Sequence, residues 1–146
     1  MFTLTLEELR ESFRADNLAS GTAVTDGGDW LTIEEYTEDR IVASTDVTEE
    51  HARKGGTIAG NTLFRFFDAI GYLVTLAQSP KGSEAFTTDL SIHFLRPGPL
   101  GRFFIEGRPL KFGRRASVVA VTISSPLVPE GPVASGVITY APAWPS

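Results

Sequence analysis

Residues 61–77 read NTLFRFFDAIGYLVTLA and form the longest helical pattern in the chain. Apolar side chains recur in this segment so often that they nearly encircle a helix, and a helix that is apolar all round is usually buried. The segment therefore predicts a long central helix that the rest of the chain must cover. Its apolar members are Leu63, Phe64, Phe66, Phe67, Ile70, Leu73, Val74 and Leu76.

Strand patterns lie on both sides of this helix. Before it, residues 30–36 and 40–48 are β-branched and aromatic, and the turn between them predicts a hairpin. After it come four strand candidates, which are residues 86–95, 102–112, 115–125 and 133–141. The breaks between these four are short, so we expect strands that are neighbours in the sequence to pair antiparallel.

The opening segment predicts a short N-terminal helix, because Thr5 and Glu8 form a capping-box pattern. A polar loop over residues 16–29 follows it. The order of elements predicts a single α+β domain over residues 1–146, with an antiparallel sheet wrapped around the central helix. One sheet cannot cover both itself and its helix, so we expect a second copy of the chain to cover the remaining face or edge.

Composition excludes several classes of function. The chain of 146 residues has 13 basic and 18 acidic side chains and no cysteine. An acidic balance gives no electrostatic reason to bind nucleic acid or an anionic membrane, and a thiolate metal site is impossible. No segment is long and apolar enough to span a bilayer, and the charged start does not resemble a secretory signal. We therefore expect a cytoplasmic protein without a metal or other cofactor.

Asp68 is the most informative single residue, because it interrupts the apolar helix. Burying a carboxylate without partners costs several kcal/mol. One interpretation makes Asp68 a general base or nucleophile with a raised pKa. The other places it on one solvent-facing strip of the helix, paired with Arg65. The residues alone leave both open.

Gly60 and Asn61 begin the same helix. A helix start presents unpaired N–H groups and the positive end of the dipole, so it can serve as an oxyanion hole. The alternative is a plain N-cap with Asn61 as the cap residue. Asp68 lies about 12 Å from Gly60 along the axis, at 1.5 Å per residue. One helix therefore cannot bring both groups to the same carbonyl carbon.

A basic cluster is the third candidate. Lys111, Arg114 and Arg115 flank Gly113, which we expect at positive φ in a tight hairpin. These side chains could bind a phosphate-bearing ligand or could simply be solvated, and Arg96 is a similar case.

The only histidines, His51 and His93, are far apart and form no metal-binding pattern. His93 shares a strand with Thr87, Asp89 and Ser91 at alternate positions, so we expect all four side chains on one face.

Three runs, in this order, carry a resemblance to a known family. They are RKGGTIAGNTLFRFFDAIGYLVTLA, FTTDLSIHFLRPGPLGRFFIEGRPLKFGRRASVVAVTI and PVASGVITYAP, within residues 53–142. Together they resemble the hotdog-fold acyl-CoA thioesterases of the phenylacetate-degradation type. The resemblance implies a long helix wrapped by a curved antiparallel sheet, active sites between two subunits, and hydrolysis of acyl-CoA without a metal.

The resemblance also implies roles for individual residues. Asp68 matches the catalytic carboxylate, and Gly60 with Asn61 matches the stretch whose N–H groups bind the thioester oxygen. Thr87 matches a hydroxyl residue on the neighbouring subunit's strand that orients the attacking water. The hairpin 113–115 matches the one near bound CoA, and we expect Lys111 and Arg96 to contribute there.

One departure from the family keeps other functions open. The family has a histidine where this chain has Ala59, and its second glycine is Asn61 here. We expect a homo-oligomer, a dimer or a tetramer, that hydrolyses acyl-CoA. The missing histidine favours, as the alternative, a protein that binds acyl-CoA or another small apolar ligand without turnover. A hotdog dehydratase ranks third, because it needs a histidine near the helix start.

Overall fold

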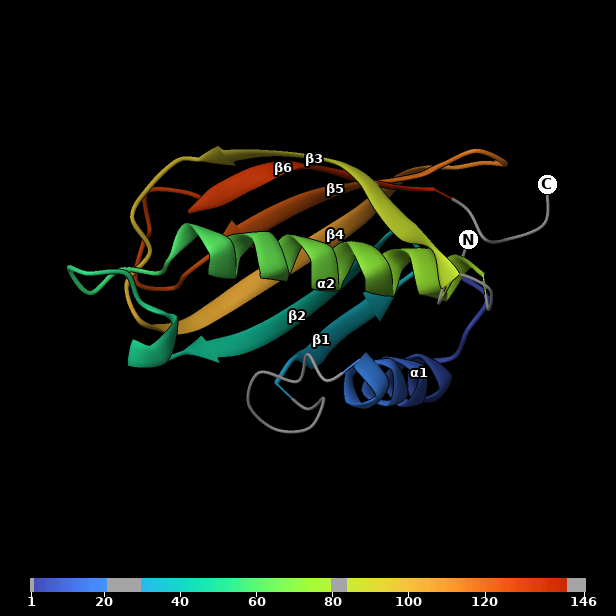
Figure 1. Cartoon of the computed structure of the whole chain (residues 1–146), viewed down its shortest axis with the longest axis horizontal. Helices are drawn as coiled ribbons and strands as arrows, with labels where there is room; N and C mark the ends of the chain where they lie inside the picture. The colour runs from blue at the N-terminus through green and yellow to red at the C-terminus, as the bar shows by residue number, and fades with distance from the viewer. Residues whose placement is uncertain (1, 21–29, 80–83, 142–146) are drawn as a thin grey trace.

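The computed structural model describes residues 2–20, 30–79 and 84–141, and Figure 1 shows the arrangement of its elements. Within these described ranges, the helices and strands follow each other in the order expected from the sequence, and a short 3-10 turn precedes the central helix. They are α1 (Leu6–Ser20), β1 (Thr32–Thr37), β2 (Arg40–Val47), η1 (Glu49–His51), α2 (Gly60–Gln78), β3 (Phe86–Phe94), β4 (Gly101–Phe112), β5 (Ser117–Ser124) and β6 (Ala134–Ala141).

The strands form one antiparallel sheet in the order β1-β2-β4-β5-β6-β3. The prediction that sequence neighbours pair is wrong for β3 and β4, because β3 pairs with β6 at the edge and β4 pairs with β2. Pro97 and Pro99 in their connection lack the N–H donors that a ladder uses. This connection instead contacts the segment before α2, where Ile58 N donates to Gly98 O over 2.9 Å.

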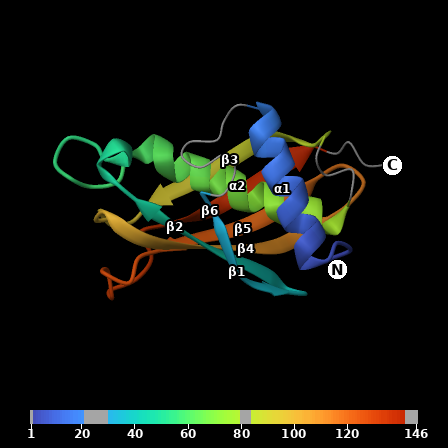
Figure 2. The same ribbon diagram turned by 90° about the horizontal axis from the view of Figure 1, so that it is seen from below.

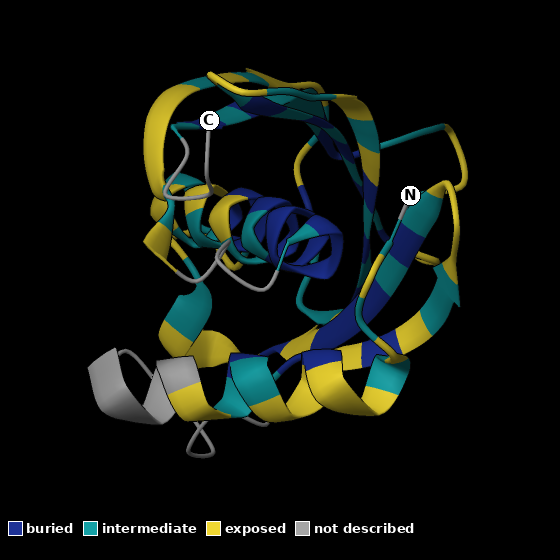
Figure 3. Cartoon of the chain, turned by 90° about the vertical axis from the view of Figure 1, so that its right-hand side faces the viewer, coloured by how far each residue is buried: buried dark blue, intermediate teal, exposed yellow. Residues whose placement is uncertain are grey.

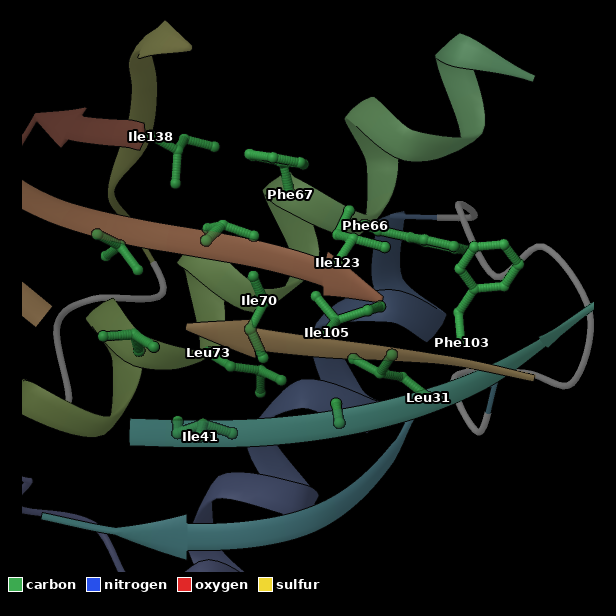
Figure 4. Packing of buried hydrophobic residues seen from close by; sticks show 14 of the residues in the cluster. Leu31, Ile41, Phe66, Phe67, Ile70, Leu73, Phe103, Ile105, Ile123 and Ile138 are labelled. Carbon is green, nitrogen blue, oxygen red and sulfur yellow. The ribbon is translucent and has the colours of Figure 1, made fainter. Parts of the chain in front are cut away.

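The sheet curves around α2, as the view along the helix in Figure 3 shows. Phe67, Ile70 and Leu73 are fully buried among apolar residues of the facing strands (Figure 4). The helix lies very close to β4, because a Cβ on Gly107 would come within 2.9 Å of both Ile70 and Val74. This close contact fixes which side of α2 faces the sheet and which side stays open.

One side of the first half of α2 is exposed, so the prediction of a helix buried all round is wrong for that half, whereas Leu73–Gln78 are buried. Asn61, Phe64 and Asp68 are exposed, and their spacing places them on one side of the helix. We call these three residues the open stripe. Strand β3 is also exposed, except for half-buried Leu90 and Ile92. The open stripe and the free edge of β3 are the surfaces for which the sequence predicted a second copy.

The predicted capping box at the start of the N-terminal helix is confirmed, but the helix is longer than predicted. Thr5 N donates to Glu8 Oε1 over 2.9 Å, and Glu8 N donates to Thr5 Oγ1 over 3.1 Å. The helix continues to Ser20, where a loop was expected from residue 16. Leu18 and Ala19 are better helix formers than their polar neighbours suggested. The rest of that predicted loop lies outside the described residues. Figure 2 shows α1 crossing below α2 and the β1–β2 hairpin.

Candidate active site

The carboxylate of Asp68 accepts two hydrogen bonds from hydroxyl groups on two strands. Thr87 Oγ1 on β3 donates to Asp68 Oδ1 over 2.8 Å, and Tyr140 OH on β6 donates to the same oxygen over 2.8 Å. Among the described residues, Oδ2 has no hydrogen-bond partner. The carboxylate is exposed rather than buried in this single chain, because it lies on the open stripe. Of the two interpretations that the sequence left open, this position agrees with the one that places Asp68 on a solvent-facing strip of the helix.

Tyr140 is a site residue that the sequence analysis missed. Its side chain is only 2% exposed, and its hydroxyl also donates to the backbone oxygen of Asp68 over 2.7 Å. Burial, and then the negative charge of Asp68, raise the pKa of Tyr140 well above its usual value. Tyr140 therefore stays protonated and acts as a donor. A buried tyrosine hydroxyl usually needs a hydrogen-bond partner. A tyrosine in the last strand was therefore the sequence signal that could have pointed to a polar partner such as Asp68.

Gly71 allows Tyr140 to reach Asp68. It lies one helical turn beyond Asp68, where α2 packs closely against β6. A Cβ on Gly71 would come within 2.6 Å of Ile138 Cγ2 and 2.9 Å of Tyr140 Cε2. Any side chain at this position would displace the tyrosine ring, so the missing Cβ is a structural requirement of the site.

Thr87 faces the helix because β3 contains a β-bulge. The pairing with β6 shifts between Thr87 and Asp89, which places an extra residue in the strand. Thr87 therefore contacts Asp68, while Asp89, Ser91 and His93 point to the opposite face. The prediction that all four share one face is wrong for this reason.

The contact between Thr87 and Asp68 also forms within one chain. The resemblance had implied a hydroxyl from a neighbouring subunit's strand. The pairing of β3 with β6 beside α2 brings the hydroxyl to the carboxylate without a second copy.

Arg65 was the alternative partner of Asp68. Its guanidinium carbon lies over the ring of Trp30, 5.5 Å from the centroid, and burial lowers its pKa. Within the described part of the chain, the hydrogen bonds to the Asp68 carboxylate come from Thr87 and Tyr140. That alternative correctly placed Asp68 toward solvent. The ion pair that it assumed between Arg65 and Asp68 is not among these contacts.

The start of α2 has free donors. Its N-cap is Ala59, which has no side-chain acceptor, and Ala59 O accepts from Thr62 N and Leu63 N over 3.1 and 3.2 Å. In the described ranges, the N–H groups of Gly60 and Asn61 have no acceptor. The alternative in which Asn61 is the N-cap is therefore wrong, because Asn61 is the second residue of the helix.

A groove of about 340 Å³ adjoins this helix start. Its wall is mostly apolar, with two arginines. Arg96 is one of them, and its Nη1 donates to Pro132 O over 2.8 Å. The residues that line the groove are Arg53, Thr57, Ile58, Gly60, Leu63, Phe94, Leu95, Arg96, Pro97 and Gly98.

The basic hairpin lies elsewhere. Gly113 N donates to Ala116 O over 2.9 Å and closes a turn with exposed Arg114 and Arg115 at its tip, so β5 begins at Ser117. Gly113 does not have a positive φ, which corrects the prediction. In Figure 1 the β4–β5 turn lies at the same end of the molecule as the C-terminal end of α2, and α2 starts at the other end. The structure thus brings Asp68 and Thr87 together, and separates them from Gly60, Asn61 and Arg96.

Two further observations concern metal binding and membrane-spanning helices. Across the described residues, no three His, Cys, Asp or Glu side chains form a group that could hold a metal ion. The helices described here are also too short or too polar to cross a membrane.

Comparison with known proteins agrees with this fold. Residues 55–126, from before α2 to the end of β5, match the family model described as Thioesterase superfamily. The fold is the hotdog fold of thioesterases. The crystal structure of zebrafish thioesterase superfamily member 2 superposes with a TM-score of 0.81 at 21% identity, covering 95% of this chain and 99% of that chain.

Two further relatives are more similar in sequence. A Streptococcus mutans protein, smu.793, was solved bound to acetyl CoA; it is 26% identical, with a TM-score of 0.67, and the match covers 76% of this chain and 86% of that chain. A protein of Saccharolobus solfataricus, provisionally named as an esterase, is 33% identical over 82 residues. That match covers 56% of this chain and spans only 58% of the relative's length.

Proposed function

We propose that this protein is a thioesterase of the phenylacetate-degradation type, within the thioesterase superfamily. It hydrolyses acyl-CoA thioesters at a site that two copies of the chain share. One observation carries the proposal. It is the carboxylate of Asp68, which two hydroxyl groups orient on the open stripe of a hotdog helix. The Thioesterase superfamily match over the same elements and the acetyl CoA bound to the Streptococcus mutans relative support it.

The chemistry follows from the free oxygen of this carboxylate. Asp68 would take a proton from a water molecule, whose oxygen then attacks the thioester carbonyl carbon. The C–S bond breaks, and the CoA sulfur leaves with the proton that Asp68 returns. Direct attack by Asp68, followed by hydrolysis of the mixed anhydride, is the other route to the same products. Neither route requires a metal.

The negative charge that develops on the carbonyl oxygen needs donors, which the N–H groups of Gly60 and Asn61 would supply. They lie about 12 Å from Asp68 along the same helix, so the donors must come from a second copy. Gly60 lies beside Phe94, at the end of β3, and Asp68 contacts Thr87, at its start. If two β3 edges pair antiparallel, Asp68 of one copy faces Gly60 of the other.

The basic hairpin fits this arrangement. The sheet register places Ser117, Tyr140 and Thr87 side by side on β5, β6 and β3. The turn with Arg114 and Arg115 therefore adjoins the Asp68 end of the site, where it could contact the phosphates of CoA together with Lys111. Arg96, in the groove beside Gly60, would approach the same ligand from the other copy.

A panel of acyl-CoA esters tests the proposal, with the released thiol as the measured product. Straight-chain and aromatic acyl groups should both be included, because exposed Phe64, Phe86 and Phe94 could contact either. Release of thiol well above the uncatalysed rate supports a thioesterase. No release from any ester would contradict it.

Ala59 favours a second candidate, a protein that binds acyl-CoA without turnover, because its side chain offers no polar group at the start of α2. Saturable binding of the same esters by calorimetry, without release of thiol, would establish this alternative.

A further inference from the structure

Two hydroxyl groups converge on one oxygen of Asp68, and only one of them belongs to the residues expected from the family resemblance. We infer that Tyr140 is a positioning residue, which together with Thr87 fixes the Asp68 carboxylate through Oδ1 and leaves Oδ2 as the reacting oxygen. This inference rests on the proposed function, because it assigns a role within the same site.

The first argument is geometric. The hydroxyl of Tyr140 lies 2.8 Å from Oδ1 and 2.7 Å from the backbone oxygen of the same residue. Both oxygens can only accept, so they share the single phenolic hydrogen. This contact ties the side chain of Asp68 to its own backbone. The carboxylate cannot rotate about its side-chain bonds without losing it.

The second argument concerns the two oxygens. Oδ1 accepts from both Thr87 and Tyr140, and hydrogen bonds to an ionised group are roughly twice as strong as neutral ones. The two donors occupy lone pairs of the oxygen that accepts them. Oδ2, which has no partner among the described residues, keeps its lone pairs for the proton of the attacking water.

The third argument is that Tyr140 cannot serve as a base. Burial and the charge of Asp68 both hold its phenol in the protonated form. The other titratable groups near Asp68 are Tyr72, one turn further along α2, and Arg65, one turn before it; β3 contributes the neutral Thr87. The proton-accepting group of this cluster is therefore Asp68, and Tyr140 acts on the reaction only through it.

The fourth argument is that the fold makes room for this contact. Gly71 is the position where a Cβ would collide with the ring of Tyr140 and with Ile138. Glycine is disfavoured in a helix interior relative to alanine. The chain nevertheless has glycine at this position, where its missing Cβ leaves room for the phenol beside Asp68.

Replacing Tyr140 tests the inference. In Tyr140→Phe we expect kcat to fall about 10–100-fold, with little change in KM, because the carboxylate loses its orientation. Tyr36→Phe is the matched control, because it removes another phenolic hydrogen bond, from Tyr36 OH to Leu4 O, outside the site.

A second measurement does not depend on turnover. The carboxyl-carbon NMR signal of Asp68 can be observed at neutral pH and assigned from its loss in Asp68→Asn. Its chemical shift should change in Tyr140→Phe and stay the same in Tyr36→Phe. It should change in the opposite direction when Tyr140 is replaced by 3-fluorotyrosine, whose phenol is a stronger donor; this near-isosteric change keeps the test valid if Tyr140→Phe does not fold.

The outcomes separate this inference from the proposed function. An unchanged Asp68 chemical shift in the 3-fluorotyrosine protein, or an unchanged kcat in Tyr140→Phe, would overturn the role of Tyr140 even in an active thioesterase. A wild-type protein that hydrolyses no acyl-CoA would instead overturn the proposed function, and with it the reacting role of Oδ2, while the NMR chemical shifts would still decide whether Tyr140 holds the carboxylate.

Discussion

The rings of Phe64 and Phe94 meet edge to face, with their centroids 6.1 Å apart. Phe64 belongs to the open stripe of α2 and Phe94 ends β3, so this pair joins the two uncovered surfaces beside Gly60. The two side chains are 46% and 55% exposed. Exposed aromatic residues that meet at a free strand edge are typical of a protein interface.

The first prediction concerns this interface. Phe64→Asp should dissociate the oligomer, because it places a charge where two copies would meet. The fold should persist, since Phe64 is not part of the core. Leu110→Asp is the matched control: Leu110 is 60% exposed and lies on β4, away from the open stripe. Sedimentation of the wild type as a monomer at micromolar concentration would contradict both the interface and the shared site.

The second prediction concerns the basic hairpin. Arg114→Ala and Arg115→Ala should each raise KM for acyl-CoA while kcat changes little, because contacts remote from the reacting carbonyl bind substrate and transition state alike. Hydrogen bonds to charged groups contribute about 1.5–3 kcal/mol, which corresponds to roughly a tenfold or larger rise. Arg102→Ala, at the other end of β4, is the control. Equal KM values for all three variants would make the hairpin an ordinary solvated turn.

The sequence predicted most of the elements, because their signals are local. The apolar pattern of residues 61–77 and the alternation in the strands depend on nearby residues alone, and α2 and the strands begin and end close to the predicted limits. The pairing of β3 with β6 was not predictable in this way. It depends on what residues 95–100 contact elsewhere in the chain.

The candidate site was predicted only in part for the same reason. Asp68 interrupts an apolar helix, which any helical projection reveals, whereas its partner Tyr140 lies 72 residues away. The β-bulge that turns Thr87 toward the helix has no strong sequence signal. The uncovered stripe of α2 was foreseen only as one of two interpretations of Asp68, because an apolar residue such as Phe64 can belong either to a core or to a surface that meets another chain.

The third prediction concerns Gly71. Gly71→Ala should destabilise the protein by about 1–3 kcal/mol, the usual effect of overpacking a tight core, and should lower kcat because the ring of Tyr140 must move. Gly60→Ala is the control for stability, since its Cβ would meet only Phe94 Cζ, at 3.8 Å. Chemical denaturation of both variants measures the difference. A Gly71→Ala protein as stable as the wild type would show that the α2–β6 contact is loose.

The last prediction concerns Asp68 itself. Asp68→Asn removes the base but keeps an oxygen that can accept from Thr87 and Tyr140, so the local structure should survive. General-base catalysis contributes about 10²–10⁴-fold, and kcat should fall at least 100-fold while the melting temperature stays near that of the wild type. Asp89→Asn, which changes an exposed carboxylate on the opposite face of β3, should leave both values unchanged.

If Asp68 only ties α2 to β3 and β6, Asp68→Asn would instead lower stability and leave turnover per folded molecule intact. Turnover and thermal unfolding measured on one preparation distinguish these results, and the second would remove Asp68 from the mechanism.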